Sequence, residues 1–577
     1  MARGCDFLYK NREHTLTYEN LPDDLDMVRQ VAQSFVESNI DKNLGDMESL
    51  TPGFMKNALK EAGDLGLLGA AVPEDLGGSD MGFVASMIVA DAVGPGGSFA
   101  TAFGAQTGIA MLPILLYGTD AQKEKYIPGL ATGDLAGSYC LTEPGAGSDA
   151  NSGKTKAELS ADQRQYILNG QKMWITNGGF ADVYIVFAKI DDDKKLSCFV
   201  VDKDSPGLSV GEEEKKLGIK GSSTVQVYLE DCKISVESML GKRQEGFKIA
   251  LNILNAGRIK LASSANGAAK STLEHSLRYA GERKQFGGAL SSFQAIQHKI
   301  AEMAQRTFSS DTATLACGDD IEKLEKSLIA SGGNGVYRSK RIALEEYAVE
   351  CALLKVIASE SLDHVIDEGL QIYGGMGYSA EAPMERAYRD ARITRIYEGT
   401  NEINRMAGAG MAIQNVQKNL GKTLLTIFKE AVMSVISLPK RIVTESVGTS
   451  NISGVRALTL LLTTVCMFLY RKNIRTQQAV LMSLADMMSE LLMLTCTHSR
   501  VSNSGKDKSY MSHILSLQAF QANQNVKISA NDIISSLPSP VLRAPLRLLA
   551  LICLAGPRVS RFKVMDKLGE KLVNESA

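Results

Sequence analysis

The feature that most constrains the fold is a change of hydrophobic period between residues 136 and 245. Before and after this stretch, apolar residues recur at helical spacing, as they do in residues 24–32. Within it, short apolar runs rich in β-branched and aromatic residues predict strands at residues 166–168, 172–175, 183–188, 196–201 and 225–229. The pair Asn169-Gly170 between the first two runs predicts a hairpin. We therefore expect an α+β fold, mainly α, with a small β domain between helical ones.

The length of 577 residues is too great for one core, so several domains are expected. We predict an N-terminal helical domain (22–135), a middle β domain (136–245), a helical bundle (246–415) and a C-terminal helical extension (421–577). With 44% hydrophobic and 22% charged residues, the composition is that of a soluble protein and argues against disorder or a fully membrane-embedded fold.

The extension differs in charge from the rest of the chain. Residues 421–577 hold 19 Lys and Arg against 9 Asp and Glu, whereas residues 1–420 hold 44 against 56. A basic extension on an acidic body fits an anionic partner or a membrane surface, and it fits equally a basic face packed on the body. Nothing indicates a nucleic acid as partner.

Three segments of the extension bear on membrane contact. Residues 424–436 form an amphipathic helical face before Pro439, and the apolar run 457–470 is short of the ~20 residues needed to span a bilayer, which favours a buried helix. The run 546–554, held to about three turns by prolines 545 and 557, is the candidate for peripheral membrane contact, although a short core helix explains it equally well. Its basic neighbours are Arg543, Arg547, Arg558, Arg561 and Lys563.

The nine cysteines and six histidines show no metal-ligand spacing. We expect a reducing compartment, no disulfide framework and no metal, with Cys140, Cys198, Cys351 and Cys553 as small core residues. The first residues have neither an apolar signal core nor a basic amphipathic presequence. The expected location is the bacterial cytoplasm, including the inner membrane surface; the alternative is a mature protein whose targeting segment has been removed.

A candidate catalytic residue stands out in the segment 395–403. Glu398 lies between an aromatic residue and a glycine, at a joint before an apolar helical pattern. In an apolar pocket the charged form of a carboxylate is disfavoured, so its pKa rises and it can accept a proton near neutral pH. The ordinary alternative is a helix-capping or surface glutamate.

Four more segments carry possible binding residues. The loop at 139–149 holds hydroxyls, and its glycines let backbone N–H groups approach a flat ring or a phosphate. Residues 173–179 contain the only tryptophan beside a threonine and a turn, 282–287 form a basic–aromatic cluster suited to a pyrophosphate, and 371–378 form a glycine-rich joint. Each of the last three, taken alone, is more typical of a structural turn than of a binding site.

Together and in this order, the five segments resemble the acyl-CoA dehydrogenase family of flavoenzymes, over about residues 25–415. The extension resembles that of the very-long-chain branch. The resemblance implies FAD as cofactor and the α,β-dehydrogenation of saturated, long-chain acyl-CoA thioesters to trans-2-enoyl-CoA. It also implies electron-transfer flavoprotein as electron acceptor and at least a homodimer.

The resemblance also assigns roles to individual residues. Glu398 would be the catalytic base, and its backbone N–H would hold the thioester carbonyl. The substrate would further contact Ser148, Arg258 and Gly399. The expected flavin contacts are Tyr139, Leu141 and Thr142 along the isoalloxazine, Ser148 near the diphosphate, Trp174 and Thr176 at the ring, Arg283, Phe286, Gln371 and Gly375 on a neighbouring subunit's FAD, and Thr400 and Glu402 on the adenine side.

Two further expectations concern the substrate cavity. Some family members carry the base just before the arginine that matches Arg258, but residues 254–257 hold no carboxylate, so Glu398 is the base that the sequence offers. Arg258 would lie near the substrate entrance or steady Glu398, and a structural ion pair is the alternative. Small residues could leave room for a long acyl chain, or allow close helix packing, at Gly97, Ala100, Ala102, Gly104 and Ala105.

Two alternative functions fit the same sequence. An acyl-CoA oxidase would use the same base but would let oxygen reach the reduced flavin. A non-catalytic assembly or scaffold protein could keep the fold, although the presence of Glu398 argues against this reading.

Overall fold

The computed structural model describes residues 3–438, 449–504, 509–555 and 560–576. Its N-terminal part is helical, as the hydrophobic period predicts, and begins with short 3-10 turns at Asp6–Leu8 and Tyr18–Asn20. The helices are α1 (Asp23–Phe35), α2 (Leu44–Glu48), α3 (Phe54–Asp64), α4 (Gly82–Val93), α5 (Ser98–Gly104), α6 (Met111–Tyr117) and α7 (Asp120–Thr132). Between α5 and α6 the chain forms a π-helical turn, Ala105–Ala110.

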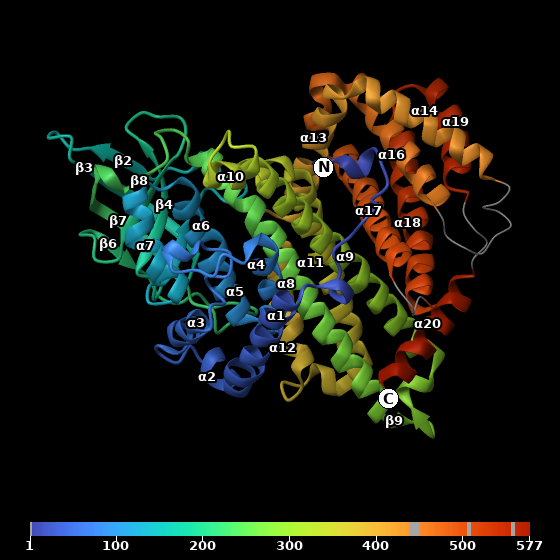
Figure 1. Cartoon of the computed structure of the whole chain (residues 1–577), viewed down its shortest axis with the longest axis horizontal. Helices are drawn as coiled ribbons and strands as arrows, with labels where there is room; N and C mark the ends of the chain where they lie inside the picture. Colours follow the sequence, from blue (N-terminus) through green and yellow to red (C-terminus); the bar gives the residue numbers. More distant parts are fainter. Residues whose placement is uncertain (1–2, 439–448, 505–508, 556–559, 577) are drawn as a thin grey trace.

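The middle β domain follows at the left of Figure 1. Its strands are β1 (Gly137–Cys140), β2 (Lys156–Leu159), β3 (Gln165–Thr176), β4 (Val183–Ile190), β5 (Ser197–Asp202), β6 (Leu208–Val210), β7 (Thr224–Ser235) and β8 (Met239–Leu240). They form a sheet in the order β6-β7-β3-β2-β4-β5-β8, with β1 also paired to β4. Both β1 and β2 run parallel to β4, at residues 183–186 and 189–190 respectively, so the loop 141–155 leaves the sheet where one strand stops and the next begins.

The predicted hairpin at Asn169-Gly170 is wrong. Residues 165–176 form one strand, β3, and at a shift of register Asn169 faces two residues of β7, 230 and 231. The Asn169 side chain bonds across the sheet, donating to Asp231 Oδ1 (3.1 Å) and accepting from the Asp231 N–H (2.8 Å). The dipeptide therefore marks a β-bulge, because a partner 62 residues away in sequence satisfies the asparagine better than a local turn would.

The helical bundle contains α8 (Gly246–Glu282), α9 (Gln294–Ala330), α10 (Val336–Glu346), α11 (Ala348–Tyr373), α12 (Pro383–Ala391) and α13 (Asn401–Lys418). A small hairpin, β9 (Lys284–Gln285) and β10 (Gly288–Ala289), follows α8. Helices α8 and α11 pack closely against each other and lie at the centre of the molecule in Figure 1.

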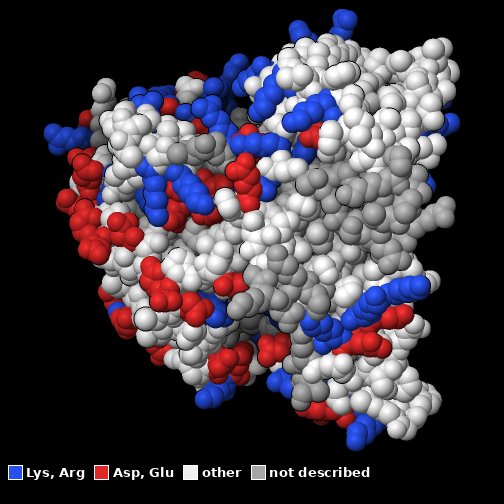
Figure 2. Space-filling model, turned by 45° about the vertical axis from the view of Figure 1, so that its right-hand side comes forward, with Lys and Arg blue, Asp and Glu red and all other residues white. Residues whose placement is uncertain are grey.

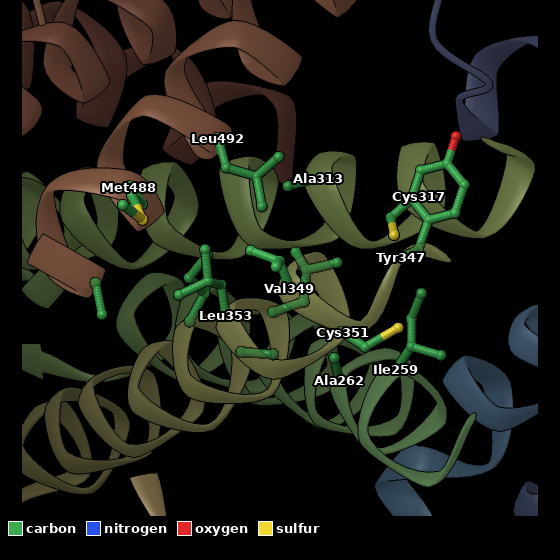
Figure 3. Packing of buried hydrophobic residues seen from close by; sticks show 14 of the residues in the cluster. Ile259, Ala262, Ala313, Cys317, Tyr347, Val349, Cys351, Leu353, Met488 and Leu492 are labelled. Atoms are coloured by element: carbon green, nitrogen blue, oxygen red, sulfur yellow. The ribbon is translucent and has the colours of Figure 1, made fainter. Parts of the chain in front are cut away.

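The C-terminal extension is also helical, with α14 (Leu420–Ile436), α16 (Thr449–Tyr470), α17 (Gln478–Asn503), α18 (Ser509–Ser536), α19 (Pro540–Cys553) and α20 (Arg561–Ser576). It packs on the bundle rather than standing apart. Figure 3 shows Met488 and Leu492 of α17 in the same apolar interior as Ala313 of α9 and Leu353 of α11.

Two details of the extension differ from the sequence prediction. The helix at the apolar run is 22 residues long, not 14, because it starts at Thr449. Pro545 lies inside α19 rather than at its start. Helix α19 begins five residues earlier, at Pro540, whose fixed φ suits the first helical position. Pro439, Pro557 and Arg558 lie outside the described residues.

Among the described residues, three helical stretches are long and apolar enough to cross a membrane: Ser98–Tyr117, Asn451–Thr476 and Gln478–Asn503. Within each stretch, most of the apolar 18-residue window is buried inside the protein, 78%, 72% and 72% respectively. The interior thus covers most of the apolar surface of the run 457–470, as the prediction of a buried helix requires. All nine cysteines are buried, which confirms the core assignment of the four named above.

The charge asymmetry has a partial explanation in packing. Arg500 of α17 pairs with Glu19 and also lies 3.6 Å from Asp311, and Arg561 of α20 lies 3.0 Å from Glu302 on α9. These basic side chains of the extension therefore lie against acidic side chains of the body.

Candidate active site

Glu398 lies in a tight turn between the bundle helices, just before α13. Glu398 and Gly399 both have positive φ, 57° and 83°, a conformation that is strained for a residue with a side chain. The turn lifts the carboxylate out of the helical path and aims it at α8. There, a Cβ built on Gly257 would lie 2.8 Å from Glu398 Oε2, so a side chain at position 257 would displace the carboxylate.

Three side chains hold this turn by its carbonyl oxygens. Arg258 Nε donates to the Glu398 carbonyl (3.1 Å), and Lys355 Nζ donates to the Gly399 carbonyl (2.8 Å) and to Asn401 Oδ1 (2.8 Å). Asn404 Nδ2 donates to the Gly399 carbonyl (2.7 Å). Arg258 therefore steadies the Glu398 turn through its backbone, which is one of the two roles expected from the sequence.

The electrostatics of the turn suit a base. Burial raises the pKa of Glu398 to about 7, although the positive charges of Arg258 and Lys355 act in the opposite direction. Burial likewise lowers the pKa of Lys355 to about 7. Glu398 Oε2 is buried with no hydrogen-bond partner among the described residues. A carboxylate that is free on one oxygen and has a pKa near 7 can take a proton at neutral pH.

Glu398 opens into a cavity of about 380 Å³. One wall is the face of α8 that runs from Gly257 to His275, and the opposite wall includes α5 and the π-helical turn. Four of the five small residues predicted to make room for an acyl chain line this cavity: Gly97, Ala100, Gly104 and Ala105. Ala102 is buried but does not contribute to the lining.

The loop 141–155 lies on the β-domain side of the site and is closed by a buried ion pair. Lys172 of β3, fully buried, lies 2.7 Å from Glu143 Oε1 and donates to the Phe187 carbonyl (2.6 Å). The Glu143 carboxylate also accepts the Thr155 N–H (3.1 Å), which ties the two ends of the loop together. The tip of the loop, with Ser148, is exposed.

The Trp174 segment lies directly beside this loop, since the Met173 N–H donates to the Thr142 carbonyl (3.0 Å). Trp174 has φ 60° at a register shift of β3 and keeps 55% of its surface exposed. Thr176 at the end of β3 lines the same cavity as Glu398. The structure thus brings together the loop, the Trp174 segment and the base, which lie far apart in sequence.

This arrangement fits a flat aromatic cofactor such as a flavin. The Tyr139 hydroxyl is buried with no hydrogen-bond partner among the described residues, and a Cβ on Gly145 or Gly147 would meet nothing within 4 Å. An exposed indole, an unpaired phenol and an open glycine loop therefore surround the space beside Thr176. Tyr139, Leu141, Thr142, Trp174 and Thr176 would hold the ring, and Ser148 would reach the phosphate or substrate side.

A second group of predicted flavin residues lies elsewhere in the fold. Arg283, Phe286, Gln371 and Gly375 are exposed at the ends of α8 and α11, two joints held together by the stacked rings of Tyr279 and Tyr373 (4.0 Å between centroids). Figure 1 shows the β9 hairpin at the end of the bundle remote from the β domain. Within one chain these four residues do not join the Glu398 cavity.

The remaining predicted residues lie next to the base but do not line its cavity. The Thr400 hydroxyl caps α13 by accepting the Ile403 N–H (3.3 Å), and Glu402 is exposed in the first turn of that helix. Sequence patterns did not predict a role in the site for Gly257, Lys355 or the Lys172–Glu143 pair. A possible signal for Lys355 was a single charge inside the apolar run 351–358 of a buried helix.

Three family models match the chain in order. They are the N-terminal domain of acyl-CoA dehydrogenases at residues 22–134, the middle domain at 138–232 and the C-terminal domain at 244–411. The chain therefore belongs to the acyl-CoA dehydrogenase family. It is a flavoprotein oxidoreductase of fatty acid β-oxidation, and its cofactor is FAD.

Individual relatives support the same assignment. A probable acyl-CoA dehydrogenase of Bacillus subtilis (strain 168) is 38% identical over 498 residues, which cover 85% of this chain and 83% of the relative. The crystal structure of an acyl-CoA dehydrogenase from Bacillus anthracis, complexed with FAD, has a TM-score of 0.93 at 34% identity and covers 100% of this chain and 99% of that one. The extension is thus part of the shared fold.

The relatives do not indicate the length of the acyl chain in the substrate. A very-long-chain-specific enzyme of Rattus norvegicus is 33% identical over 509 residues, 83% of this chain and 74% of the relative. A short-chain-specific enzyme of the same species is 37% identical over 412 residues, 70% of this chain and 94% of the relative. Substrate length must therefore be argued from the cavity.

Proposed function

We propose that the protein oxidises saturated long-chain acyl-CoA thioesters to trans-2-enoyl-CoA. The observation that carries this proposal is the buried Glu398 carboxylate, free on Oε2 and facing a cavity next to Thr176. Glu398 removes the α-proton, which the adjacent thioester makes acidic, and its backbone N–H together with Gly399 holds the thioester carbonyl. FAD, when bound, supplies the acceptor for the β-hydrogen as hydride. Electron-transfer flavoprotein is the proposed electron acceptor.

The length of the cavity favours a long acyl chain. Its wall on α8 extends from Gly257 to His275, eighteen helical steps that span ~27 Å at the rise of an α-helix. On the opposite side, glycines and alanines of α5 and the π-helical turn stand where larger side chains would shorten the space. A long extended chain therefore fits between the two walls.

The test is an anaerobic titration of the FAD-loaded protein with saturated acyl-CoAs of increasing length, followed by the absorbance band of oxidised flavin. We expect bleaching by long chains, and its loss in Glu398→Gln with flavin still bound. Flavin that no acyl-CoA reduces would contradict the proposal and favour the scaffold reading. Rapid reoxidation of the bleached enzyme by oxygen, faster than by electron-transfer flavoprotein, would favour the oxidase.

We propose further that the protein is at least a homodimer. Phe286, 96% exposed at the tip of the β9 hairpin, and Tyr378, 84% exposed after the end of α11, are large aromatic side chains that a second subunit would cover. Arg283, Gln371 and Gly375 beside them would then reach the FAD of the partner. Light scattering should give a dimer mass for the wild type, and Phe286→Glu should lower FAD retention. A monomeric wild type that keeps its FAD would contradict this.

We also propose that the protein contacts a membrane surface peripherally through helices α14 and α19. The face of α14 predicted from the sequence is exposed, including Leu425 (68%) and Phe428 (70%), and Val541 and Leu551 of α19 are exposed as well. Helix α19 packs against α14 and α16. An exposed apolar face of this kind on a monomer usually has a partner.

The basic side chains around this apolar face favour an anionic lipid surface as the partner. Lys422 and Lys429 on α14 and Arg547 on α19 are exposed. In Figure 2 the upper part of the molecule is largely uncharged with basic side chains around it, whereas acidic side chains gather over the left half. Apolar side chains with flanking basic ones suit the interface of a bilayer that contains anionic lipids. In a bacterium this would place the protein in the cytoplasm at the inner membrane.

Co-sedimentation with vesicles tests this contact. We expect binding to vesicles with phosphatidylglycerol, weaker binding to pure phosphatidylcholine, and loss of binding in Leu425→Asp/Phe428→Asp. Met27→Asp, an equally exposed apolar site on α1, is the matched control and should bind like the wild type. Equal sedimentation of the wild type, the double variant and the control would show that α14 does not contribute to membrane binding.

A further inference from the structure

Lys260 is a buried amine that the proposed reaction does not use. It lies on α8, with 7% of its surface exposed, and forms part of the lining of the cavity that contains Glu398. Gly257, which touches the Glu398 carboxylate, lies three residues before it on the same helix. Residues three apart share a helix face, so Lys260 borders the cavity ~4.5 Å further along α8 than the base.

The hydrogen bonds of Lys260 are few and long. Its Nζ donates to the Thr107 carbonyl (3.3 Å) and to Thr107 Oγ1 (3.4 Å), both in the π-helical turn across the cavity. No carboxylate of the described chain lies within 4.0 Å of it. Burial alone lowers the pKa of Lys260 to about 8, so at pH 7 the amine is still mainly charged.

The other buried lysines of the described chain are satisfied in a different way. Lys172 has Glu143 at 2.7 Å, Lys123 has Asp120 at 3.2 Å, and Lys355 makes two bonds of 2.8 Å to the Glu398 turn. A buried ammonium without a counter-charge is costly, because desolvation of the ion is not offset by attraction to a partner. Lys260 is thus the amine of this group that is left open to a ligand.

The open position lies on the path of an acyl chain. Beyond Lys260, the lining continues along α8 through Leu261, Ser264 and Ala265. A chain whose α-carbon lies at Glu398 and whose tail follows this wall must pass the amine a few carbons beyond the reacting bond. An unsubstituted chain would bring only methylene groups to the ammonium, whereas a carboxylate would make a charge-assisted hydrogen bond with it.

We propose that Lys260 and Thr107 form a subsite for a carboxylate on the acyl chain, so that CoA half-thioesters of dicarboxylic acids are a further substrate class. This inference rests on the proposed acyl-CoA dehydrogenation. Lys260 supplies the positive charge, and the Thr107 hydroxyl, which donates to the Phe103 carbonyl (3.0 Å) in the free protein, would rotate to donate a second hydrogen bond to the ligand. Because the amine is fixed relative to Glu398, one diacid length should fit best.

The experiment compares two matched ligands on the FAD-loaded wild type. One is a series of dicarboxylic half-thioesters of CoA from glutaryl to dodecanedioyl, and the other is the ω-methyl ester of each, which has nearly the same shape without the charge. We expect one diacid length with a kcat/KM about tenfold to hundredfold above its methyl ester. Plain saturated acyl-CoAs in the same preparation show whether dehydrogenation itself is intact.

Two variants assign the preference to Lys260. Lys260→Met keeps the stem but removes the charge, and we expect it to lose the diacid preference while its KM for plain acyl-CoA falls. Lys260→Gln retains an N–H donor without charge and should lose the preference too. Ser264→Ala, on the next turn of the same wall, is the control and should affect both ligands alike.

The outcomes separate the two proposals. If plain acyl-CoA is oxidised but no diacid exceeds its methyl ester, the subsite is refuted and the dehydrogenase stands. If Lys260→Met changes both ligands equally, Lys260 only supports the carbonyl of Thr107. If no acyl-CoA of either kind is oxidised, the proposed function itself fails. Should Lys260→Met not retain FAD, the wild-type ligand pair and Lys260→Gln still decide the question.

Discussion

The carboxylate of Glu398 rests against the bare backbone of Gly257, with no room for a methyl group between them. A Cβ on Gly257 would lie 2.8 Å from Oε2 and 3.1 Å from Cδ of the glutamate. Since real Cβ atoms do not approach other atoms so closely, any side chain at this position must displace the catalytic group.

Gly257→Ala should therefore reduce activity without loss of stability. A displaced carboxylate is expected to lower kcat about hundredfold. The helix itself should be slightly stabilised, because alanine favours a helix over glycine by about 1 kcal/mol. Steady-state kinetics and thermal unfolding of the FAD-loaded protein check both parts. Gly281→Ala in the same helix, where a Cβ meets nothing within 4 Å, should leave activity unchanged. Full activity in Gly257→Ala would show that the carboxylate can move freely.

The pH dependence of kcat/KM should follow the ionisation of Glu398. The base must be deprotonated, so activity should rise with pH through about 7, the raised pKa of this carboxyl. Arg258 and Lys355 both stabilise the carboxylate, so Lys355→Met should move the midpoint to higher pH. A lower rate with an unchanged midpoint would mean that Lys355 only supports the turn through the Gly399 carbonyl.

Glu350 on α11 should make the fold less stable as pH rises. Burial raises the pKa of Glu350 to about 8 in the folded protein, against 4.5 for a free glutamate. Between these values the folded state binds more protons than the unfolded state, so the free energy of unfolding falls as pH rises from about 4.5 to about 8. Glu350→Gln should remove this slope and stabilise the protein above pH 7 by about 1–3 kcal/mol. Urea unfolding at pH 6 and pH 8.5 measures it, with the exposed Glu345→Gln as control.

Arg456 should be essential for attaching the extension. Its guanidinium is fully buried and bonds Glu430 of α14 (3.0 Å), Asn11 (2.7 Å) and the Phe7 carbonyl (3.3 Å). Arg456→Met leaves the Glu430 charge buried and should cost about 3–5 kcal/mol in the free energy of unfolding. The double variant Arg456→Met/Glu430→Met should recover most of this loss. A single variant as stable as the wild type would show that Glu430 does not need the arginine.

The sequence predicted the elements whose signals are local. Strands β4, β5 and β7 agree with the short apolar runs, and α1 with helical spacing, because side-chain period reports which face of a single element is buried. Local signals failed where a distant residue competes. Asn169-Gly170 is a turn pair by composition, but Asp231 across the sheet bonds the asparagine and turns the pair into a bulge.

The residues of the candidate site likewise fall into two groups, those that the sequence predicted and those that it did not. Glu398, the glycine loop and the Trp174 segment were identified from residue types and their order, and the structure places them together. Gly257 and Lys355 carry no such signal, because a glycine or a lysine inside a helix acquires its role only when another helix brings the Glu398 turn against it.

By itself, then, the sequence determined the helical and β units, the family resemblance and the choice of Glu398 as the candidate base, since these depend on local periods, residue types and the order of segments along the chain. Only the tertiary structure decided which apolar faces stay uncovered, as on α14, and which buried charges have partners. Burial and pairing depend on contacts between residues far apart in the chain. The isolated amine of Lys260 and the satisfied amine of Lys355 look alike in sequence and differ only in what the fold places beside them.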